Sequence, residues 1–144
     1  MSEFELSEWI NAAPESVFAV VTDPARAPDV IKSVKQMEKL TDGPVQSGTR
    51  FRETRVVNGK EAQTELTVIA CQPPRHYAVS TEQSGITVTY TYTLVPENGG
   101  TRVQLHANIT GGGLKKLALP VVASIMRRED GNHLENLKTA VEGT

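Results

Sequence analysis

The sequence is poor in the features that mark several common classes of protein. A single cysteine, Cys71, stands among 144 residues, which excludes an internal disulfide and is typical of a reducing compartment. Fifteen lysines and arginines are balanced by seventeen aspartates and glutamates. This argues against nucleic acid or an anionic membrane as the main partner, because both select a basic surface. No apolar run approaches the roughly 20 residues of a membrane span. The acidic residues 1–5 lack the apolar core of a secretory signal. We therefore expect a soluble, cytoplasmic protein that does not insert into a membrane.

Motifs for metal, phosphate or nucleophilic chemistry are also missing. His76, His106 and His133 are not spaced as metal ligands, and Cys71 has no histidine or cysteine at ligand spacing, so we expect no metal and no cofactor. His106 shares its face with polar residues, so we interpret it as solvated, whereas His76 lies beside a turn and His133 lies near polar positions of the expected helix. The glycine-rich run 111–116 lacks the lysine and hydroxyl spacing of a phosphate-binding loop. We interpret that run as the flexible entry to a helix, and we identify no catalytic residue.

The length of the chain and its even composition predict one domain over residues 1–144. Before Gly111 the sequence is mostly strand and turn. The clearest alternation of apolar and polar residues runs from Ile86 to Leu94. A short helix is expected from Pro14 to Asp23, because proline suits a first helical turn and Asp23 precedes another proline. Strands are expected over about 2–10, 33–40, 49–57, 61–69, 77–81, 86–94 and 102–109, with hairpin turns at 58–59, 84–85 and 98–100.

The last part of the chain changes to a helical period. Apolar residues recur there at three- and four-residue steps: Leu114, Leu117, Ala118, Val121, Val122, Ile125, Met126, Leu134, Leu137 and Val141. Pro120 interrupts or restarts this helix and Gly131 weakens it. We expect a short segment over about 113–119 and one main helix over about 120–141. Since that helix needs cover, the pattern favours a curved antiparallel sheet that grips it and encloses a pocket.

Five short stretches of this chain match a known family. They are Ala13–Phe18 with Asp23-Pro24, Gly48–Phe51, Pro73–Arg75, Gly99–Val103, and Pro120–Val122 through Leu134–Lys138. On these residues the chain resembles the START-like or Bet v 1-like helix-grip superfamily (SRPBCC). Within that superfamily it is similar to the polyketide cyclase, dehydrase and lipid transport group. The resemblance covers nearly the whole chain, but its motifs specify turns and packing.

The resemblance implies an α+β fold in which about seven antiparallel strands wrap around a long C-terminal helix, with short helices after the first strand. A cavity is then expected between the sheet and the helix. Members of the superfamily bind lipids, sterols, polyketides or plant hormones. A few cyclise or dehydrate polyketides, and others serve as cochaperones. Because they share no catalytic constellation, the resemblance transfers no catalytic residue to this chain.

Twelve residues are candidates for contact with a ligand. The expected walls are Phe18, Phe51, Leu66, Val68, Tyr90, Tyr92, Leu105, Leu117, Val121 and Ile125. Glu53 and Arg55 join them if Phe51 faces inward, and would then form a pair inside the cavity. If the opposite face of that strand is inward, both are solvated. Tyr90 and Tyr92 either present hydroxyl groups to a ligand or pack as core aromatics.

Three functions remain open at this point. The first is the binding of a small, largely hydrophobic molecule by a monomer or homodimer. The second is a polyketide cyclase or dehydratase that uses Glu53, Arg55, Tyr90 or Tyr92 for proton transfer. The third is a cochaperone-like interaction domain, which requires a filled core or an exposed apolar patch, hinted at by Trp9.

Overall fold

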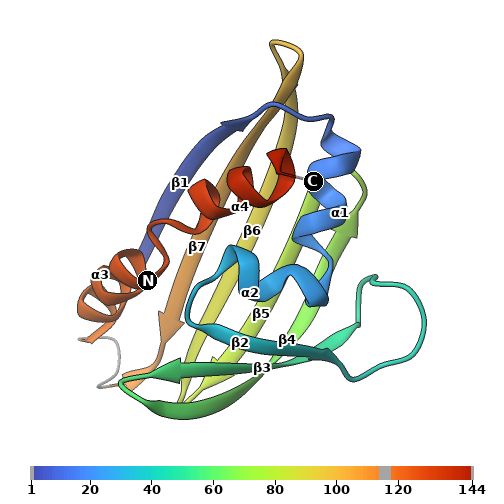
Figure 1. Ribbon diagram of the computed structural model, residues 1–144. Helices are drawn as coiled ribbons and strands as arrows, with labels where there is room; N and C mark the ends of the chain where they lie inside the picture. Colours follow the sequence, from blue (N-terminus) through green and yellow to red (C-terminus); the bar gives the residue numbers. More distant parts are fainter. Residues whose placement is uncertain (1, 114–117, 144) are drawn as a thin grey trace.

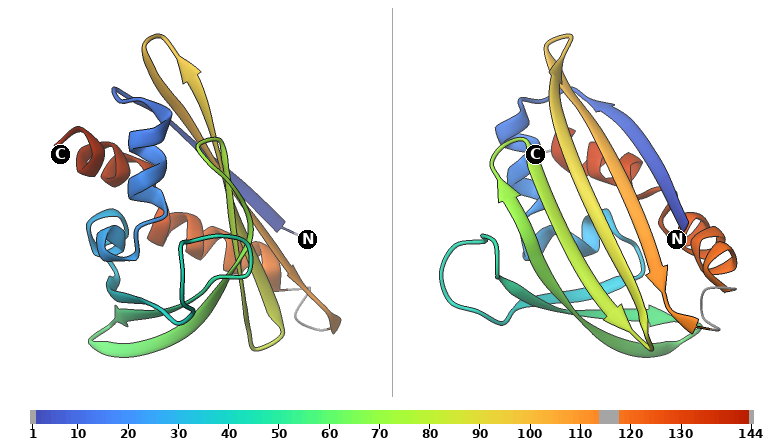
Figure 2. Two further views of the ribbon diagram at one scale, coloured as in Figure 1. Left: turned by 90° about the vertical axis from the view of Figure 1, so that its right-hand side faces the viewer. Right: turned by 180° about the vertical axis from the view of Figure 1, so that it is seen from behind.

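A curved antiparallel sheet forms one side of the molecule, and the helices lie against its concave face (Figure 1, Figure 2). The computed structural model describes residues 2–113 and 118–143. Within these residues the sheet has seven strands in the order β1-β7-β6-β5-β4-β3-β2. The strands are β1 (Ser2–Ile10), β2 (Val34–Lys39), β3 (Arg50–Val57), β4 (Lys60–Gln72), β5 (His76–Gln83), β6 (Ile86–Glu97) and β7 (Gly100–Gly111). The helices are α1 (Pro14–Val21), the 3-10 helix η1 (Pro24–Arg26), α2 (Ala27–Val30), α3 (Leu119–Asp130) and α4 (His133–Glu142). The expected α+β fold is confirmed.

The three predicted hairpin turns are present. Each places an Asn or Ser followed by a glycine in the left-handed backbone region: Asn58-Gly59, Ser84-Gly85 and Asn98-Gly99. These turns set the register of the strands that they join. Along β6, residues from Ile86 to Glu97 pair continuously with β7, and those from Ile86 to Thr93 also pair with β5. The alternation read from the sequence therefore decides which side chains face the helices.

Helix α1 begins at the predicted residue and ends just before the predicted stop. Pro14 lies in its first turn, and Glu15 adds a negative charge there, which the helix dipole favours. After α1, the side chain of Asp23 accepts a hydrogen bond from the backbone N–H of Ala25 at 3.0 Å, which starts η1. Helices α1 and α2 follow one another along the concave side of the sheet, and α2 lies next to β2 (Figure 1).

The C-terminal helical region differs from the expectation in its continuity. It is divided into α3 and α4 at Gly131 and Asn132, whereas one helix over about 120–141 was expected. Glycine has a low helix propensity, and Asn132 has backbone angles of −95° and 6°, from which α4 starts afresh. Helix α3 begins at Leu119 with Pro120 in its first turn, as predicted. The short segment expected over 113–119 falls largely outside the described residues.

The buried core has two parts. The larger cluster joins the sheet to α1, α2 and α4 and includes Ile10, Phe18, Leu105 and Leu137. The smaller cluster joins α3 to β1, β6 and β7 and includes Phe4, Ile109 and Leu119. Tyr90 and Leu6 pack against both clusters. This division leaves room between the sheet and the helices for a site.

Candidate functional site

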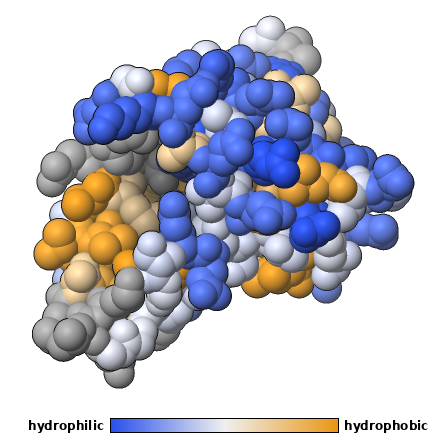
Figure 3. Space-filling view, turned by 90° about the horizontal axis from the view of Figure 1, so that it is seen from below, coloured by the Kyte–Doolittle hydropathy of each residue, from blue (hydrophilic) through white to orange (hydrophobic). Residues whose placement is uncertain are grey.

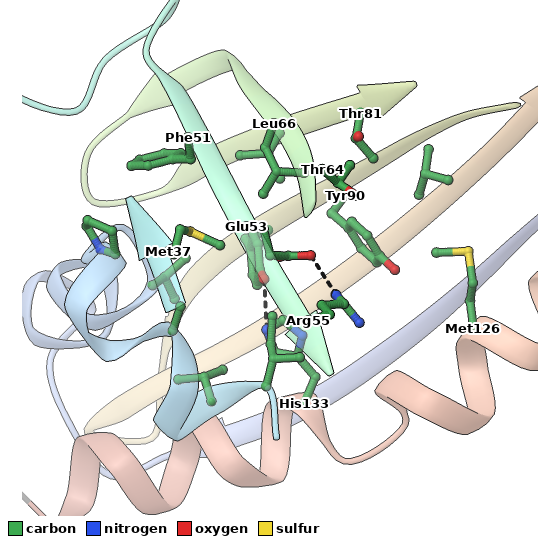
Figure 4. Close-up of a pocket in the computed structure, with 18 of the residues that line it drawn as sticks. Met37, Phe51, Glu53, Arg55, Thr64, Leu66, Thr81, Tyr90, Met126 and His133 are labelled. Atoms are coloured by element: carbon green, nitrogen blue, oxygen red, sulfur yellow. Dashed lines mark hydrogen bonds and ion pairs between the residues drawn. The ribbon is translucent and has the colours of Figure 1, made fainter. Parts of the chain in front are cut away.

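A cavity of about 460 Å³ lies between the concave face of the sheet and the helices. Ligand pockets in proteins commonly measure roughly 300–1,000 Å³, so the space suits a small molecule. Met37 and Phe51 lie at one end of it and Met126 lies at the other, with Glu53 and Arg55 between them (Figure 4). Strands β3 to β6 form its floor and walls, and residues of α2, α3 and α4 cover it.

Most of the wall is apolar. Phe51 on β3 lies directly opposite Leu66 on β4, and Val79 on β5 lies opposite Tyr90 on β6. All four residues line the cavity. Because side chains on one face of a sheet alternate along each strand, these pairs form a continuous apolar surface. Such a surface favours a ligand that is apolar over most of its length.

An ion pair lies in this apolar surface. The Nε of Arg55 donates to Oε1 of Glu53 over 2.6 Å, and the Nη1 of Arg55 donates to the hydroxyl of Ser33 over 3.1 Å. The side chain of Glu53 is 7% exposed and that of Arg55 is 26% exposed. Both residues line the cavity beside Phe51. The sequence left open which face of β3 points inward. In the structure, Phe51, Glu53 and Arg55 face the cavity.

A second polar contact connects the sheet to α4. The hydroxyl of Tyr92 lies 2.8 Å from Nε2 of His133, and both side chains line the cavity. Although the sequence places His133 near polar positions of the helix, its side chain is buried, with an exposure of 6%. The reason is the new start of α4, which puts His133 four residues before Leu137 and on the same buried face. His106 is half-buried and contacts Glu3 at 2.8 Å on the outer part of the fold.

Tyr77 completes a row of aromatic rings with Tyr92 and Phe18. Its ring centre lies 6.1 Å from that of Tyr92 and 6.0 Å from that of Phe18. Burial, with a smaller contribution from the charge of Cys71, raises the pKa of Tyr77 well above its ordinary value. Burial also raises the pKa of the Cys71 thiol. Tyr77 therefore stays protonated and lines the cavity as a neutral residue.

The structure brings together seven of the twelve candidate residues around the cavity. These are Phe51, Glu53, Arg55, Leu66, Tyr90, Tyr92 and Ile125. Three others, Phe18, Val68 and Leu105, are packed in the larger core cluster and do not line the cavity. Val68 pairs with Val79 and Leu105 pairs with Tyr92, so both share a face with lining residues, but both are almost completely buried beside the cavity. Leu117 lies outside the described residues.

Val121 is the clearest difference from the expected wall. It is 61% exposed and does not line the cavity. The face of α3 that meets the sheet carries Leu119 and Ala123, four residues apart, so Val121 points to one side of it. Ile125 is 47% exposed yet also lines the cavity, which shows that the cavity opens beside α3. Apolar side chains gather on this side of the lower face (Figure 3).

Several lining residues were missed from the sequence. Thr64, Thr81 and Gln83 add neutral polar groups, and Met37 and Val30 add apolar ones. The alternation along β5 contains a usable signal, because Tyr77, Val79, Thr81 and Gln83 share one face. Met37 and Val30 carry no such signal, since their short elements have little periodicity.

Trp9, which hinted at an interaction surface, is held by contacts within the chain. Its indole N–H donates to the carbonyl of Glu97 over 2.8 Å, and the Lys138 ammonium lies 5.3 Å from its ring centre. Within residues 2–113 and 118–143 there is no group of three or more histidine, cysteine or acidic side chains suited to a metal ion. Over the same part of the chain, no helix has the length and apolarity needed to cross a bilayer.

Comparison with solved structures shows the same fold over the whole chain. The crystal structure of the di-domain ARO/CYC BexL matches with a TM-score of 0.81 and 18% identity, over 99% of this chain and 47% of that one. Ara h 8.0201 matches with a TM-score of 0.79 and 18% identity, over 99% of both chains. The protein TTHA0849 from Thermus thermophilus matches with a TM-score of 0.79 and 20% identity, over 99% and 98% of the two chains. No curated protein sequence matches the chain.

The family comparison agrees with the fold and with the expected resemblance. The family described as polyketide cyclase / dehydrase and lipid transport matches residues 1–142. This range contains every strand and helix of the structure and all the residues that line the cavity. The chain therefore belongs to the polyketide cyclase / dehydrase and lipid transport family.

Proposed function

We propose that this protein binds a small, largely apolar molecule in the cavity between the sheet and helices α2, α3 and α4. The observation that carries this proposal is the cavity itself, about 460 Å³ in volume and lined mainly by apolar side chains. The family description, which includes lipid transport, supports the same kind of ligand. A filled core at this position would instead favour an interaction domain.

The source of affinity follows from the composition of the wall. Each Å² of apolar surface removed from water contributes about 25 cal/mol, so burial of the ligand's apolar part supplies most of the binding free energy. The polar groups of Glu53, Arg55, Tyr92 and His133 orient the ligand because they stand at fixed places in this surface.

Binding of a neutral fluorescent dye tests the proposal. N-phenylnaphthylamine should bind the wild-type protein, and native mass spectrometry should show whether the purified protein carries a ligand that denaturation releases. Val79→Trp fills the cavity and should weaken dye binding at least about tenfold, equal to about 1.4 kcal/mol. The matched control, Val95→Trp, adds the same ring at an exposed position of β6 and should leave binding unchanged. Equal dye binding by both variants would contradict a binding site in this cavity.

A second candidate function is a cyclase or dehydratase acting on a polyketide-like substrate. The observation that favours it is that Glu53, Arg55, Tyr92 and His133 all line one cavity, as general acid–base catalysis requires. A β-hydroxyketone probe distinguishes this function from binding alone, because dehydration converts it into an enone and water. Loss of enone formation in His133→Gln with retained probe binding would support the enzyme. No enone from the wild-type protein with bound probe would favour a binding protein.

A further inference from the structure

We infer that the Glu53–Arg55 pair makes the cavity select neutral molecules with a hydroxyl group over anions of the same length, such as fatty acids. This inference rests on the proposed function and names the class of ligand. It starts from the position of the pair, which lies between the two apolar ends of the cavity (Figure 4). A ligand that spans the cavity therefore lies across Glu53 and Arg55, and a polar group in its path contacts both charges.

The geometry of the pair puts opposite charges side by side. The contact between Arg55 Nε and Glu53 Oε1 is 2.6 Å, and Ser33 accepts a further hydrogen bond from Arg55. An anionic group that approaches Arg55 thus also approaches the carboxylate of Glu53. Since Glu53 is 7% exposed, water and salt screen its repulsion only weakly. The attraction that an arginine without this carboxylate would offer to an anion is largely cancelled here.

A hydroxyl group matches the same pair without this conflict. Its oxygen accepts a hydrogen bond from a guanidinium N–H, and its hydrogen donates to a carboxylate oxygen. Thr64, which lies opposite Glu53 on β4 and also lines the cavity, adds a neutral hydroxyl beside it. An anion would lose its hydration on entering this surface and gain little in return.

The remaining charge of the cavity acts in the same direction. The described lining residues include two acidic side chains, Asp23 and Glu53, and one basic side chain of the lysine or arginine type, Arg55. They carry two negative charges and one positive charge. Asp23 lies next to Pro24, and its side chain caps η1. These described residues therefore supply no excess of positive charge that would compensate a buried anion.

Displacement of N-phenylnaphthylamine by decanol and by decanoate, at about pH 8 where the acid is ionised, tests this inference. The wild-type protein should bind decanol at least about tenfold more tightly than decanoate. Glu53→Gln removes the carboxylate beside Arg55, so the preference for decanol should fall by about tenfold or more. The variant Glu53→Gln with Arg55→Gln removes both charges and should restore the preference for decanol. Circular dichroism spectra of all three proteins identify a variant that fails to fold.

Each result bears on one of the two proposals. Equal or tighter binding of decanoate by the wild-type protein would overturn the inference while leaving a binding function intact. An unchanged preference in a folded Glu53→Gln protein would overturn the role of the pair, because a general preference for the less polar molecule would then explain the data. Failure of the dye, decanol and decanoate alike to bind would overturn the proposed function, and the inference with it. The wild-type comparison needs no variant, so it holds even if Glu53→Gln does not fold.

Discussion

The hydroxyl group of Tyr92, in the middle of the sheet, lies 2.8 Å from Nε2 of His133, the first residue of α4. Both side chains are buried, and their rings are 5.6 Å apart at their centres. The contact joins the floor of the cavity to the point where α3 and α4 separate. It therefore holds the cover of the cavity in place as well as adding polar groups to its wall.

Loss of this contact should destabilise the fold. Tyr92→Phe removes the hydroxyl group that contacts Nε2 of the buried His133 ring. The free energy of unfolding should therefore fall by about 1–3 kcal/mol. Combining Tyr92→Phe with His133→Leu removes both polar partners and should cost less than the sum of the two single changes. Urea unfolding of the three variants measures this coupling. Additive losses would mean that the two groups do not stabilise each other.

A close approach between β1 and β7 gives a second prediction. A side chain at Gly100 would collide with the carbonyl oxygen of Ile10 and lie 2.7 Å from Cζ2 of Trp9. Gly100→Ala should therefore destabilise the protein by about 1–3 kcal/mol, the usual range for overpacking. Because the chain contains one tryptophan, a change in fluorescence should report the displaced ring. Gly112→Ala is the control, since no described residue other than its chain neighbours comes within 4 Å of its added carbon, and it should change neither stability nor fluorescence.

The strands were predictable because their signals are local. Residues 86–94 alternate without interruption, and the turns at 58–59 and 98–100 carry residues that tolerate a left-handed backbone. The side of a strand that faces the helices is harder to decide. On β3 the apolar Val56 competes with Phe51 for the inward face, and only the packing of Phe51 against Leu66 and the cover of α2 settle the register.

The helical part of the site was predicted less well, for a physical reason. Val121 and Ile125 were both assigned to the wall on the assumption of one continuous helix over about 120–141, but of these two only Ile125 lines the cavity. The break at Gly131 and Asn132 gives α3 and α4 separate orientations, so apolar residues before and after it need not share a face. Small shifts in the packing of α3 decide whether Val121 contacts the sheet or solvent. A periodic pattern contains no information on such shifts.

The ion pair in the cavity predicts a specific pattern of stabilities. Glu53→Met removes the carboxylate beside Arg55 in a largely apolar wall and should lower the free energy of unfolding by at least about 2 kcal/mol. This is below the roughly 3–5 kcal/mol of a fully buried pair, because Arg55 is 26% exposed. Adding Arg55→Met removes the remaining charge of the pair and should recover part of the loss. Denaturant unfolding checks the order, and a double variant less stable than Glu53→Met would contradict it.

The raised pKa of the buried Tyr77 leads us to expect that the free energy of unfolding falls in alkaline solution. Burial raises its pKa in the folded protein, whereas an unfolded chain releases the same proton near a pKa of about 10. The stability that this protonated hydroxyl contributes is thus complete below about pH 10 and is lost as the pH rises above that value, because the unfolded state then binds fewer protons than the folded state. Tyr77→Phe should flatten the decline in urea unfolding measured from about pH 8 to pH 11.

The neighbours of Tyr77 make this prediction more specific. Cys71 lies opposite Tyr77 in the pairing of β4 with β5, and the negative charge of its thiolate, where the thiol ionises, adds to the effect of burial on the pKa of Tyr77. Cys71→Ser removes that charge and should reduce the alkaline decline without abolishing it, since burial is the larger cause. Tyr90→Phe leaves both Tyr77 and Cys71 in place and should keep the decline. If Tyr77→Phe and Tyr90→Phe had the same alkaline profile as the wild-type protein, the hydroxyl of Tyr77 would be accessible to solvent and not enclosed by the row of rings.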